Sequence, residues 1–213
     1  MELDVRFVDN HVLVVRKPPG MPTQEDESRD LDLVSLAKAW VKLRFDKPGA
    51  VFVGLVHRLD RPVGGLLVLA RTSKGAARLS EQLRAHGLEK RYLAVVHGHV
   101  PGDTHRLDLP LDGQVALTEV CVLGRGTSAC GPVTELDVRI VTGRKHQIRR
   151  HLAGLGHPIV GDFRYGSKTP LPGRRIALEA VLLVFRHPTK DEVLRFTSER
   201  PADFPEVQGT QRA

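Results

Sequence analysis

The chain is poor in cysteine and aromatic residues and has no long apolar run. Its 213 residues include two cysteines, Cys121 and Cys130, and aromatic residues make up 5% of the sequence. Two cysteines without metal-ligand spacing form no disulfide framework, so we expect a reducing, cytoplasmic environment. No apolar run approaches the roughly 18 to 20 residues that span a bilayer, and residues 1–10 have no signal-peptide pattern. The composition therefore argues against a membrane protein and against a disulfide-rich secreted domain.

Several catalytic motifs are also missing. The sequence has no phosphate-binding Walker motif, no dinucleotide-binding glycine fingerprint and no nucleophile elbow of the hydrolase type. Its ten histidines include His97 and His99 in one short stretch, and His146 and His151 in another. Neither pair has the spacing and companion ligands of a zinc site. The sequence thus predicts neither a metal nor a nucleotide cofactor.

The bulk composition is that of a folded protein with a positive charge. Apolar residues make up 41% and charged residues 27%, which is ordinary for a globular domain. The length suits one domain with a substantial core, so we expect one domain over 1–205 and a flexible tail over 206–213. The net charge of +7 favours a polyanionic partner, because cations that neutralise phosphates release counterions. A generic basic surface would give the same charge.

Hydrophobic periodicity predicts three helices. Residues 31–46 and 72–87 have apolar side chains at helical spacing. Thr72 or Ser73 is suited to cap the second of these helices, and Gly87 to end it. A third helix is expected over 144–156, and its core face carries Ile148, Leu152 and Leu155.

The strands outnumber the helices and often follow one another directly. Alternating apolar and polar residues predict a hairpin over 5–20, and short apolar runs predict buried strands. Further strands are expected over 50–56, 65–71, 90–100, 134–143, 174–188 and 192–198. This order favours an α+β fold with a mixed, mostly antiparallel central sheet flanked by helices.

The stretch VHRLDRPVGG, residues 56–65, places a carboxylate where a predicted buried strand breaks into a glycine turn. Glycine allows backbone conformations and close approaches that other residues do not. A carboxylate there serves as nucleophile or base, and the neighbouring Arg58 and Arg61 keep it ionised. The alternative is a turn aspartate, Asp60, held in a surface ion pair with one of these arginines. The spacing alone leaves both open.

A second cluster of functional side chains lies in residues 142–166. Six cationic or titratable side chains gather on or just before one short helix: Arg144, Lys145, His146, Arg149, Arg150 and His151. Such a cluster suits phosphate contacts, and one arginine can turn inward to a carboxylate. A solvated basic helix face remains the alternative.

A third candidate is Tyr92, in the predicted strand 90–100. Strand tyrosines usually fill the core and leave the hydroxyl at its rim. Their rings also stack on unpaired nucleobases. One tyrosine does not decide between these roles.

Taken together, these segments resemble the RluA family of RNA pseudouridine synthases. The resemblance rests on four segments in the family's order: VVRKPPGMPTQ (14–24), GLVHRLDRPVGGLLVLART (54–72), KRYLAVVHG (90–98) and TGRKHQIRRHLAGLGHPIVGDFRYG (142–166). It spans about residues 8–200 and begins almost at Met1, so the chain resembles the compact branch without an N-terminal S4 domain. The resemblance implies the pseudouridine synthase fold with an active-site cleft, an RNA substrate, no cofactor, no metal and a monomer.

The resemblance also implies residue roles. Asp60 matches the catalytic aspartate, Tyr92 the residue that packs against the flipped uracil, and Arg149 the arginine that pairs with the aspartate. Arg58 matches the residue that helps displace the target nucleotide from its stack. Flipping is required because a paired base hides the reacting atoms. The residues expected to bind RNA are Arg58, Arg61, Arg144, Lys145, His146 and Arg150.

The implied reaction converts uridines of ribosomal RNA, transfer RNA or both to pseudouridine. It breaks the N1–C1′ bond, turns the uracil and rejoins it through C5, with no redox change and no net hydrolysis. Asp60 would attack C1′, add to C6 or remove a sugar proton, and the sequence does not choose among these routes.

One departure from the family concerns the catalytic turn. Val63 and Gly64 stand where Thr-Ser is usual, so we expect a looser loop that keeps its activity. This departure is the sole support for an alternative function, a non-catalytic RNA-binding or ribosome-assembly factor of the same fold. A nuclease using Asp60 with His57 or His146 would need a carboxylate metal cluster that the sequence does not offer.

Overall fold

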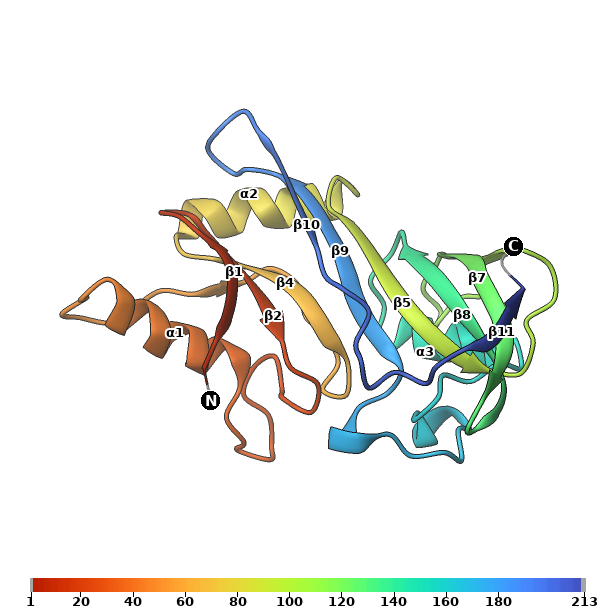
Figure 1. Cartoon of the computed structure of the whole chain (residues 1–213). Coiled ribbons are helices and arrows are strands. Elements are labelled where there is room, and N and C mark those ends of the chain that lie inside the picture. Colours follow the sequence, from red (N-terminus) through yellow and green to blue (C-terminus); the bar gives the residue numbers. More distant parts are fainter. Residues whose placement is uncertain (1, 212–213) are drawn as a thin grey trace. The chain divides into compact units, whose positions relative to one another are not determined.

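The computed structural model describes residues 2–211 (Figure 1). The chain divides into two compact units. Within the described residues, the first comprises 2–89 and 182–198, and the second comprises 90–181 and 199–211. The chain crosses from one unit to the other after residues 89, 181 and 198, and the second of these boundaries falls inside β9 (Leu178–Arg186). Each unit is α+β, as the order of the predicted elements indicated.

The first unit is a sheet with two helices. Its strands are β1 (Asp4–Val8), β2 (Val12–Lys17), β3 (Gly54–Leu55), β4 (Gly64–Ala70), β10 (Val193–Thr197) and the second half of β9. Antiparallel pairs join β1 to β2, β2 to β4, β3 to β4 and β9 to β10. The helices are α1 (Leu33–Arg44) and α2 (Ser73–Arg84).

Alternate residues of the first unit's strands build its core. Val12, Val14, Leu66 and Val68 point to one side and cluster with Leu79 of α2. The intervening residues are also buried, so both faces of β2 and β4 are covered. The uninterrupted apolar sequence of β4 predicts this burial.

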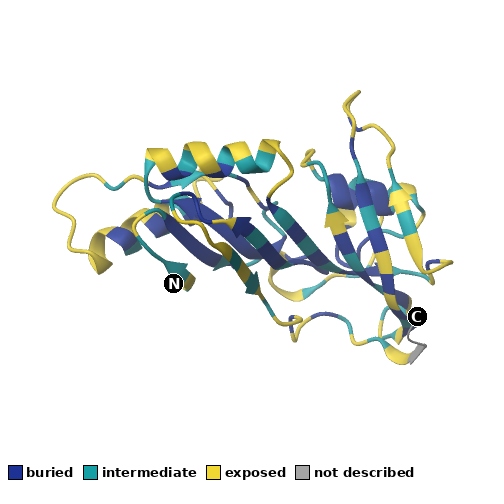
Figure 2. Cartoon of the chain, turned by 90° about the horizontal axis from the view of Figure 1, so that it is seen from above, coloured by how far each residue is buried: buried dark blue, intermediate teal, exposed yellow. Residues whose placement is uncertain are grey.

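Both helices of the first unit begin as their sequences indicate. The Thr72 hydroxyl accepts a hydrogen bond from the Gly75 amide at 3.0 Å and caps α2, and Asp32 caps α1 through the Ser35 amide. These side chains satisfy amides that have no partner within the helix. Figure 2 shows exposed outer faces and buried inner faces on the helices.

The second unit is built around a long hairpin. Its strands are β5 (Glu89–His97), β6 (Thr104–Leu107), β7 (Thr118–Ser128), β8 (Gly131–Ile140), β11 (Gln208–Gln211) and the first half of β9. Antiparallel pairs join β5 to β8, β8 to β7, and β7 to both β6 and β11. One α-helix, α3 (Gln147–Gly154), and two 3₁₀ turns, Phe163–Tyr165 and Pro172–Arg174, complete its described residues.

Two sequence predictions differ substantially from the structure, and the helix expected over 144–156 is shorter, Gln147–Gly154. The buried strand expected over 50–56 is reduced to Gly54–Leu55, and Phe52 is 49% exposed. A short apolar run does not by itself define a strand. Most of residues 50–56 instead form irregular chain that leads into a tight loop. The flexible tail expected over 206–213 contains β11, which pairs with β7. Residues 212–213 lie outside the described part.

Candidate active site

Asp60 lies in the loop between β3 and β4, residues 56–63, which we call the Asp60 loop. The Val63 amide donates a hydrogen bond to the Asp60 carbonyl at 3.0 Å, which closes a tight turn. Gly65 follows in a left-handed conformation with φ 118°, which a residue with a side chain adopts only with strain. The reversal from the loop into β4 therefore requires glycine at this position.

The segment 17–23 holds the Asp60 loop on both sides of the aspartate. Before it, the Thr23 hydroxyl donates to the Leu59 carbonyl at 2.7 Å and accepts from the Leu59 amide at 3.3 Å. After it, the Arg61 carbonyl accepts from the Gly20 amide at 2.8 Å and from Lys17 Nζ at 3.3 Å. Both backbone neighbours of Asp60 are thus fixed by side chains and amides of one segment.

Lys17 is the buried anchor of this segment. Its side chain is fully buried, and Nζ also donates to the carbonyls of Pro18 at 3.0 Å and Met21 at 2.8 Å. Charged donors form stronger hydrogen bonds than neutral ones, and a buried ammonium needs such partners. The segment RKPPGM thereby folds around its own lysine, a role that the sequence did not reveal.

Arg61 points to the acidic loop that precedes α1. Its guanidinium donates to the Gly20 carbonyl at 3.0 Å and to the Ser28 hydroxyl at 2.9 Å, and it forms ion pairs with Asp26 and Asp30. The hydrogen bond from Arg61 lowers the pKa of Asp30. This geometry gives Arg61 a role in joining two loops. Arg58, predicted beside it as an RNA contact, is exposed.

Arg149 is a buried residue of α3 in the second unit. Its Nε and Nη2 donate to the two carboxylate oxygens of Asp162 at 2.7 and 2.9 Å, and both side chains are nearly inaccessible. The guanidinium carbon also lies 5.0 Å from the centre of the Tyr165 ring. Bidentate pairing fixes the plane and direction of a guanidinium, so Arg149 has one defined orientation.

Asp162 and Tyr165 are functional candidates that the sequence reading missed. They belong to the segment GDFRYG, residues 161–166, which follows α3. In the sequence this segment is part of the resemblance over 142–166, but no residue in it stands out. The Tyr165 hydroxyl also hydrogen-bonds His146 Nδ1 at 2.8 Å. The sequence signal for Asp162 is an acid directly after a glycine, and the structure shows that this glycine, Gly161, is left-handed with φ 90°.

Tyr92 lies in β5 and is 5% exposed. It stands opposite Val138 of β8 in the antiparallel register. The ring is therefore held by the sheet of the second unit, and the side chain has little freedom to move.

The other residues predicted to contact RNA differ in exposure and in whether their charge is paired with a carboxylate. Arg144 and Lys145 are exposed, and Arg144 donates from Nε to the Val115 carbonyl. Arg150 pairs with both oxygens of Asp112 at 2.8 and 3.0 Å, and this hydrogen bond lowers the pKa of Asp112 and raises that of Arg150. Lys145 is thus more accessible to a phosphate than Arg150.

Gln147 fixes the approach to α3. The buried amide oxygen accepts from the Thr142 hydroxyl at 2.7 Å and from the Arg144 amide at 3.0 Å, while its nitrogen donates to Leu117 and Thr118. One side chain therefore ties the basic segment to β7.

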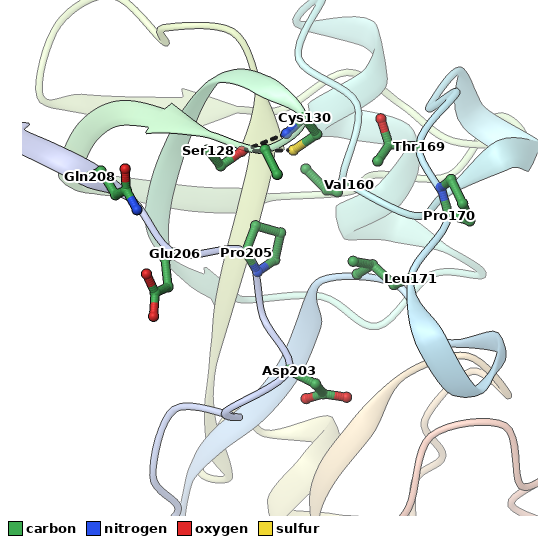
Figure 3. Close-up of a pocket in the computed structure, with 11 residues that line it drawn as sticks. Ser128, Cys130, Val160, Thr169, Pro170, Leu171, Asp203, Pro205, Glu206 and Gln208 are labelled. Atoms are coloured by element: carbon green, nitrogen blue, oxygen red, sulfur yellow. Dashed lines mark hydrogen bonds between the residues drawn. The ribbon is translucent and has the colours of Figure 1, made fainter.

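A cavity of about 380 Å³ lies in the second unit (Figure 3). It is lined by the β7–β8 turn, the loop 169–171 and the C-terminal segment 203–208. Asp203 at its edge is ion-paired with Arg175. None of the nine residues proposed above from the sequence lines this cavity.

Residues 2–211 contain neither a metal-binding cluster nor a membrane-spanning helix. No group of three or more histidine, cysteine or acidic side chains there is placed to hold a metal ion. No helix in the same range is long and apolar enough to cross a membrane.

Comparison with known proteins places the chain among enzymes of one kind. The profile of the RNA pseudouridylate synthase family matches residues 11–154. Ribosomal large subunit pseudouridine synthase D of Xanthomonas campestris is 35% identical, over 99% of this chain and 70% of that protein. The dual-specificity RNA pseudouridine synthase RluA of Vibrio parahaemolyticus is 34% identical, over 96% and 86%.

A solved structure agrees with these sequence relatives. Human RNA pseudouridylate synthase domain containing 1 superimposes with a TM-score of 0.74 and 26% identity, over 97% of this chain and 89% of that one. The segments that match span the Asp60 loop, β5 and α3.

Proposed function

The chain belongs to the RNA pseudouridylate synthase family and is an RNA pseudouridine synthase, and we propose that Asp60 is its catalytic carboxylate. The observation that carries this proposal is how the aspartate is held. It lies inside the matched region, and segment 17–23 fixes the residues on both sides of it. A group that must meet one atom of a nucleotide needs such positioning.

The chemistry requires a fixed carboxylate in each candidate route. The N1–C1′ bond of uridine breaks, the uracil turns, and a new bond forms between C5 and C1′, while the C5 hydrogen leaves as a proton and N1 takes up a proton. In this proposal Asp60 attacks C1′, adds to uracil C6, or removes a sugar proton that is later returned. All three routes begin from the ionised aspartate.

Two residues of the second unit complete the proposed catalytic set. In the substrate complex Arg149 pairs with the Asp60 carboxylate and keeps it charged and directed. The bidentate bond from Arg149 to Asp162 supports this, because it pre-orients the guanidinium at no cost during the reaction. Tyr92 packs against the flipped uracil, and its placement within β5 supports a rigid contact surface.

The substrate is proposed to be ribosomal RNA, transfer RNA or both, in the cytoplasm, with the enzyme acting as a monomer. The relatives whose names mention the ribosomal large subunit and dual specificity support this choice of RNA. Arg58, Arg144 and Lys145 offer exposed cations for phosphates. Arg61, His146 and Arg150 are proposed to shape the RNA-binding surface through the contacts described above.

Tritium release tests the proposal. Uridine labelled at C5 loses its label to water only when C5 becomes the glycosidic carbon. Purified protein is incubated with C5-labelled bulk transfer RNA and, separately, ribosomal RNA, and Asp60→Asn is compared with the wild type. We expect the variant to lose at least about a thousandfold in rate while binding RNA normally. Equal release by the variant would refute the assignment of Asp60, and no release by wild-type protein that binds RNA would favour an assembly factor.

A further inference from the structure

The end of α1 combines exposed cations with exposed apolar side chains. Lys42, Arg44 and Lys47 are exposed, Leu43 is 86% exposed, and Phe45 and Phe52 are 37% and 49% exposed. We call these six residues the α1 patch. Within residues 38–52 there are four cationic side chains and one carboxylate, Asp46. The patch is therefore basic and apolar at once.

The two aromatic rings of the patch are held in place. The Arg71 guanidinium carbon lies 4.0 Å above the Phe45 ring centre, and the Trp40 ring meets Phe45 edge-on at 6.3 Å. Phe52 lies over Gly54, where an added Cβ would come within 3.1 Å of its ring. Rings that are fixed yet exposed lose little freedom when a ligand covers them.

RNA fits this surface better than a protein does. Cationic side chains contact phosphates, and exposed aromatic rings stack on unpaired bases irrespective of sequence. Protein–protein interfaces are enriched in phenylalanine and arginine but depleted in lysine, and the two lysines of the patch, Lys42 and Lys47, favour RNA. Exposed phenylalanines bordered by cations are the combination that single-stranded RNA uses.

The start of α1 is joined to the Asp60 loop. The amides of Leu33 and Val34 donate to the carbonyls of Pro22 and Thr23 at 3.0 and 3.2 Å, and Thr23 in turn bonds Leu59. The 12 residues of α1 extend about 18 Å from this point. That length corresponds to roughly five stacked nucleotides at 3.4 Å each.

We propose that the α1 patch is an accessory RNA-binding site, which holds an unpaired segment of the substrate within roughly five nucleotides of the target uridine. This inference rests on the proposed function. The acidic loop before α1 is consistent with it. Asp26 and Asp30 there are paired with Arg61, so part of the negative charge before α1 is neutralised. The positive charge at the end of α1, in the α1 patch, attracts the phosphates.

The salt dependence of RNA binding tests the cationic part. The double variant Lys42→Ala/Lys47→Ala is compared with Arg84→Ala/Arg195→Ala, which removes two exposed charges elsewhere in the same unit. The probe is an unstructured 20-nucleotide RNA measured by filter binding between 50 and 200 mM salt. Loss of two phosphate contacts reduces the slope of log K against log salt by about 1.4. We expect this change in the first variant alone, and equal slopes in both variants would overturn the proposal.

Phe52 tests the aromatic part. Phe52→Ala should weaken binding of the same RNA about tenfold, and Phe52→Tyr, which keeps a ring, should restore it. The stacking role would be overturned if Phe52→Ala did not weaken binding, or if it weakened binding and Phe52→Tyr weakened it equally. Far-UV circular dichroism of each variant confirms that the helices are retained.

Turnover measurements separate this inference from the proposed reaction. On bulk RNA, Lys42→Ala/Lys47→Ala should raise KM and leave kcat unchanged. Normal turnover with an unchanged salt slope would refute the α1 patch and leave the synthase assignment standing. If the wild-type protein released no tritium while Lys42→Ala/Lys47→Ala alone reduced the salt slope, the patch would be supported and the reaction refuted.

Discussion

At the residue scale, two neighbouring arginines of α3, Arg149 and Arg150, form ion pairs that differ in burial. Arg149 and Asp162 are 6% and 2% exposed in their side chains, whereas Arg150 pairs with Asp112, which is 71% exposed. Breaking a buried pair leaves an uncompensated charge, which costs about 3–5 kcal/mol, whereas an exposed pair contributes at most about 1 kcal/mol. The chain thus supplies a matched comparison within one helix.

Asp162→Asn should therefore be far more damaging than Asp112→Asn. We expect the first to lower the free energy of unfolding by about 3 kcal/mol and to reduce tritium release strongly, because Arg149 loses its fixed direction. The second should leave the urea unfolding midpoint nearly unchanged, because solvent screens an exposed ion pair. Urea unfolding and turnover of both variants provide the measurement. Similar effects in the two variants would contradict the positioning role of Asp162.

Lys90 is a buried lysine whose contribution to the free energy of unfolding depends on pH. Burial lowers the pKa of Lys90 to about 8 from 10.5. The folded protein therefore releases this proton before the unfolded chain does, and the charged side chain destabilises the fold at pH values below about 8. That destabilisation disappears as the pH rises from about 8 to 10.5.

Replacing Lys90 with methionine should stabilise the protein at pH 7. We expect a gain of about 1–3 kcal/mol in the free energy of unfolding, which shrinks toward zero near pH 10. Urea unfolding at both pH values measures it, with the exposed Lys74→Met as control. A gain that is the same at pH 7 and pH 10 would show that packing rather than charge is responsible.

At the scale of elements, segment 17–23 and the Asp60 loop act as one structure. The buried Thr23 hydroxyl serves both backbone groups of Leu59. Thr23→Val removes both hydrogen bonds and leaves buried backbone groups without these partners, at a cost of about 1–3 kcal/mol. We expect kcat to fall while RNA affinity is kept, and Thr23→Ser to retain both. If Thr23→Val turned over RNA normally, the fastening of Leu59 would be unimportant for catalysis.

The sequence predicted elements best where local chemistry alone decides them. The Thr72 cap, the apolar run of β4 and the helical spacing of α1 each require only nearby residues, and all three are confirmed. The predicted strand over 50–56 was too long because its apolar residues serve a loop and an exposed surface. The tail that forms β11 was missed because its partner β7 lies some 80 residues earlier in the chain.

The residues of the candidate site likewise divide into those that the sequence predicted and those that depend on contacts between distant parts of the chain. Asp60, Tyr92 and Arg149 were selected because long motifs resemble those of a known family. Lys17, Thr23 and Asp162 were missed because their roles depend on contacts with residues distant in sequence or with backbone atoms. Periodicity and composition do not report such contacts, whereas a buried lysine or aspartate in a structure does.

At the scale of the whole molecule, the first unit is discontinuous in sequence. Its core cluster includes Leu183 and Phe185, which follow the second unit's main segment 90–181. The second unit is likewise completed by 199–213, which contributes β11. Neither unit corresponds to one uninterrupted piece of chain.

This order has a consequence for synthesis on the ribosome. Translation adds about 5–20 residues per second, so roughly 5–20 seconds pass between completion of residue 89 and arrival of Leu183 and Phe185. During that interval the nascent first unit lacks part of its apolar core, and Val14, Leu66 and Val68 remain incompletely covered. The beginning of the growing chain therefore keeps apolar surface exposed longest, and slow codons before residue 182 would prolong that exposure.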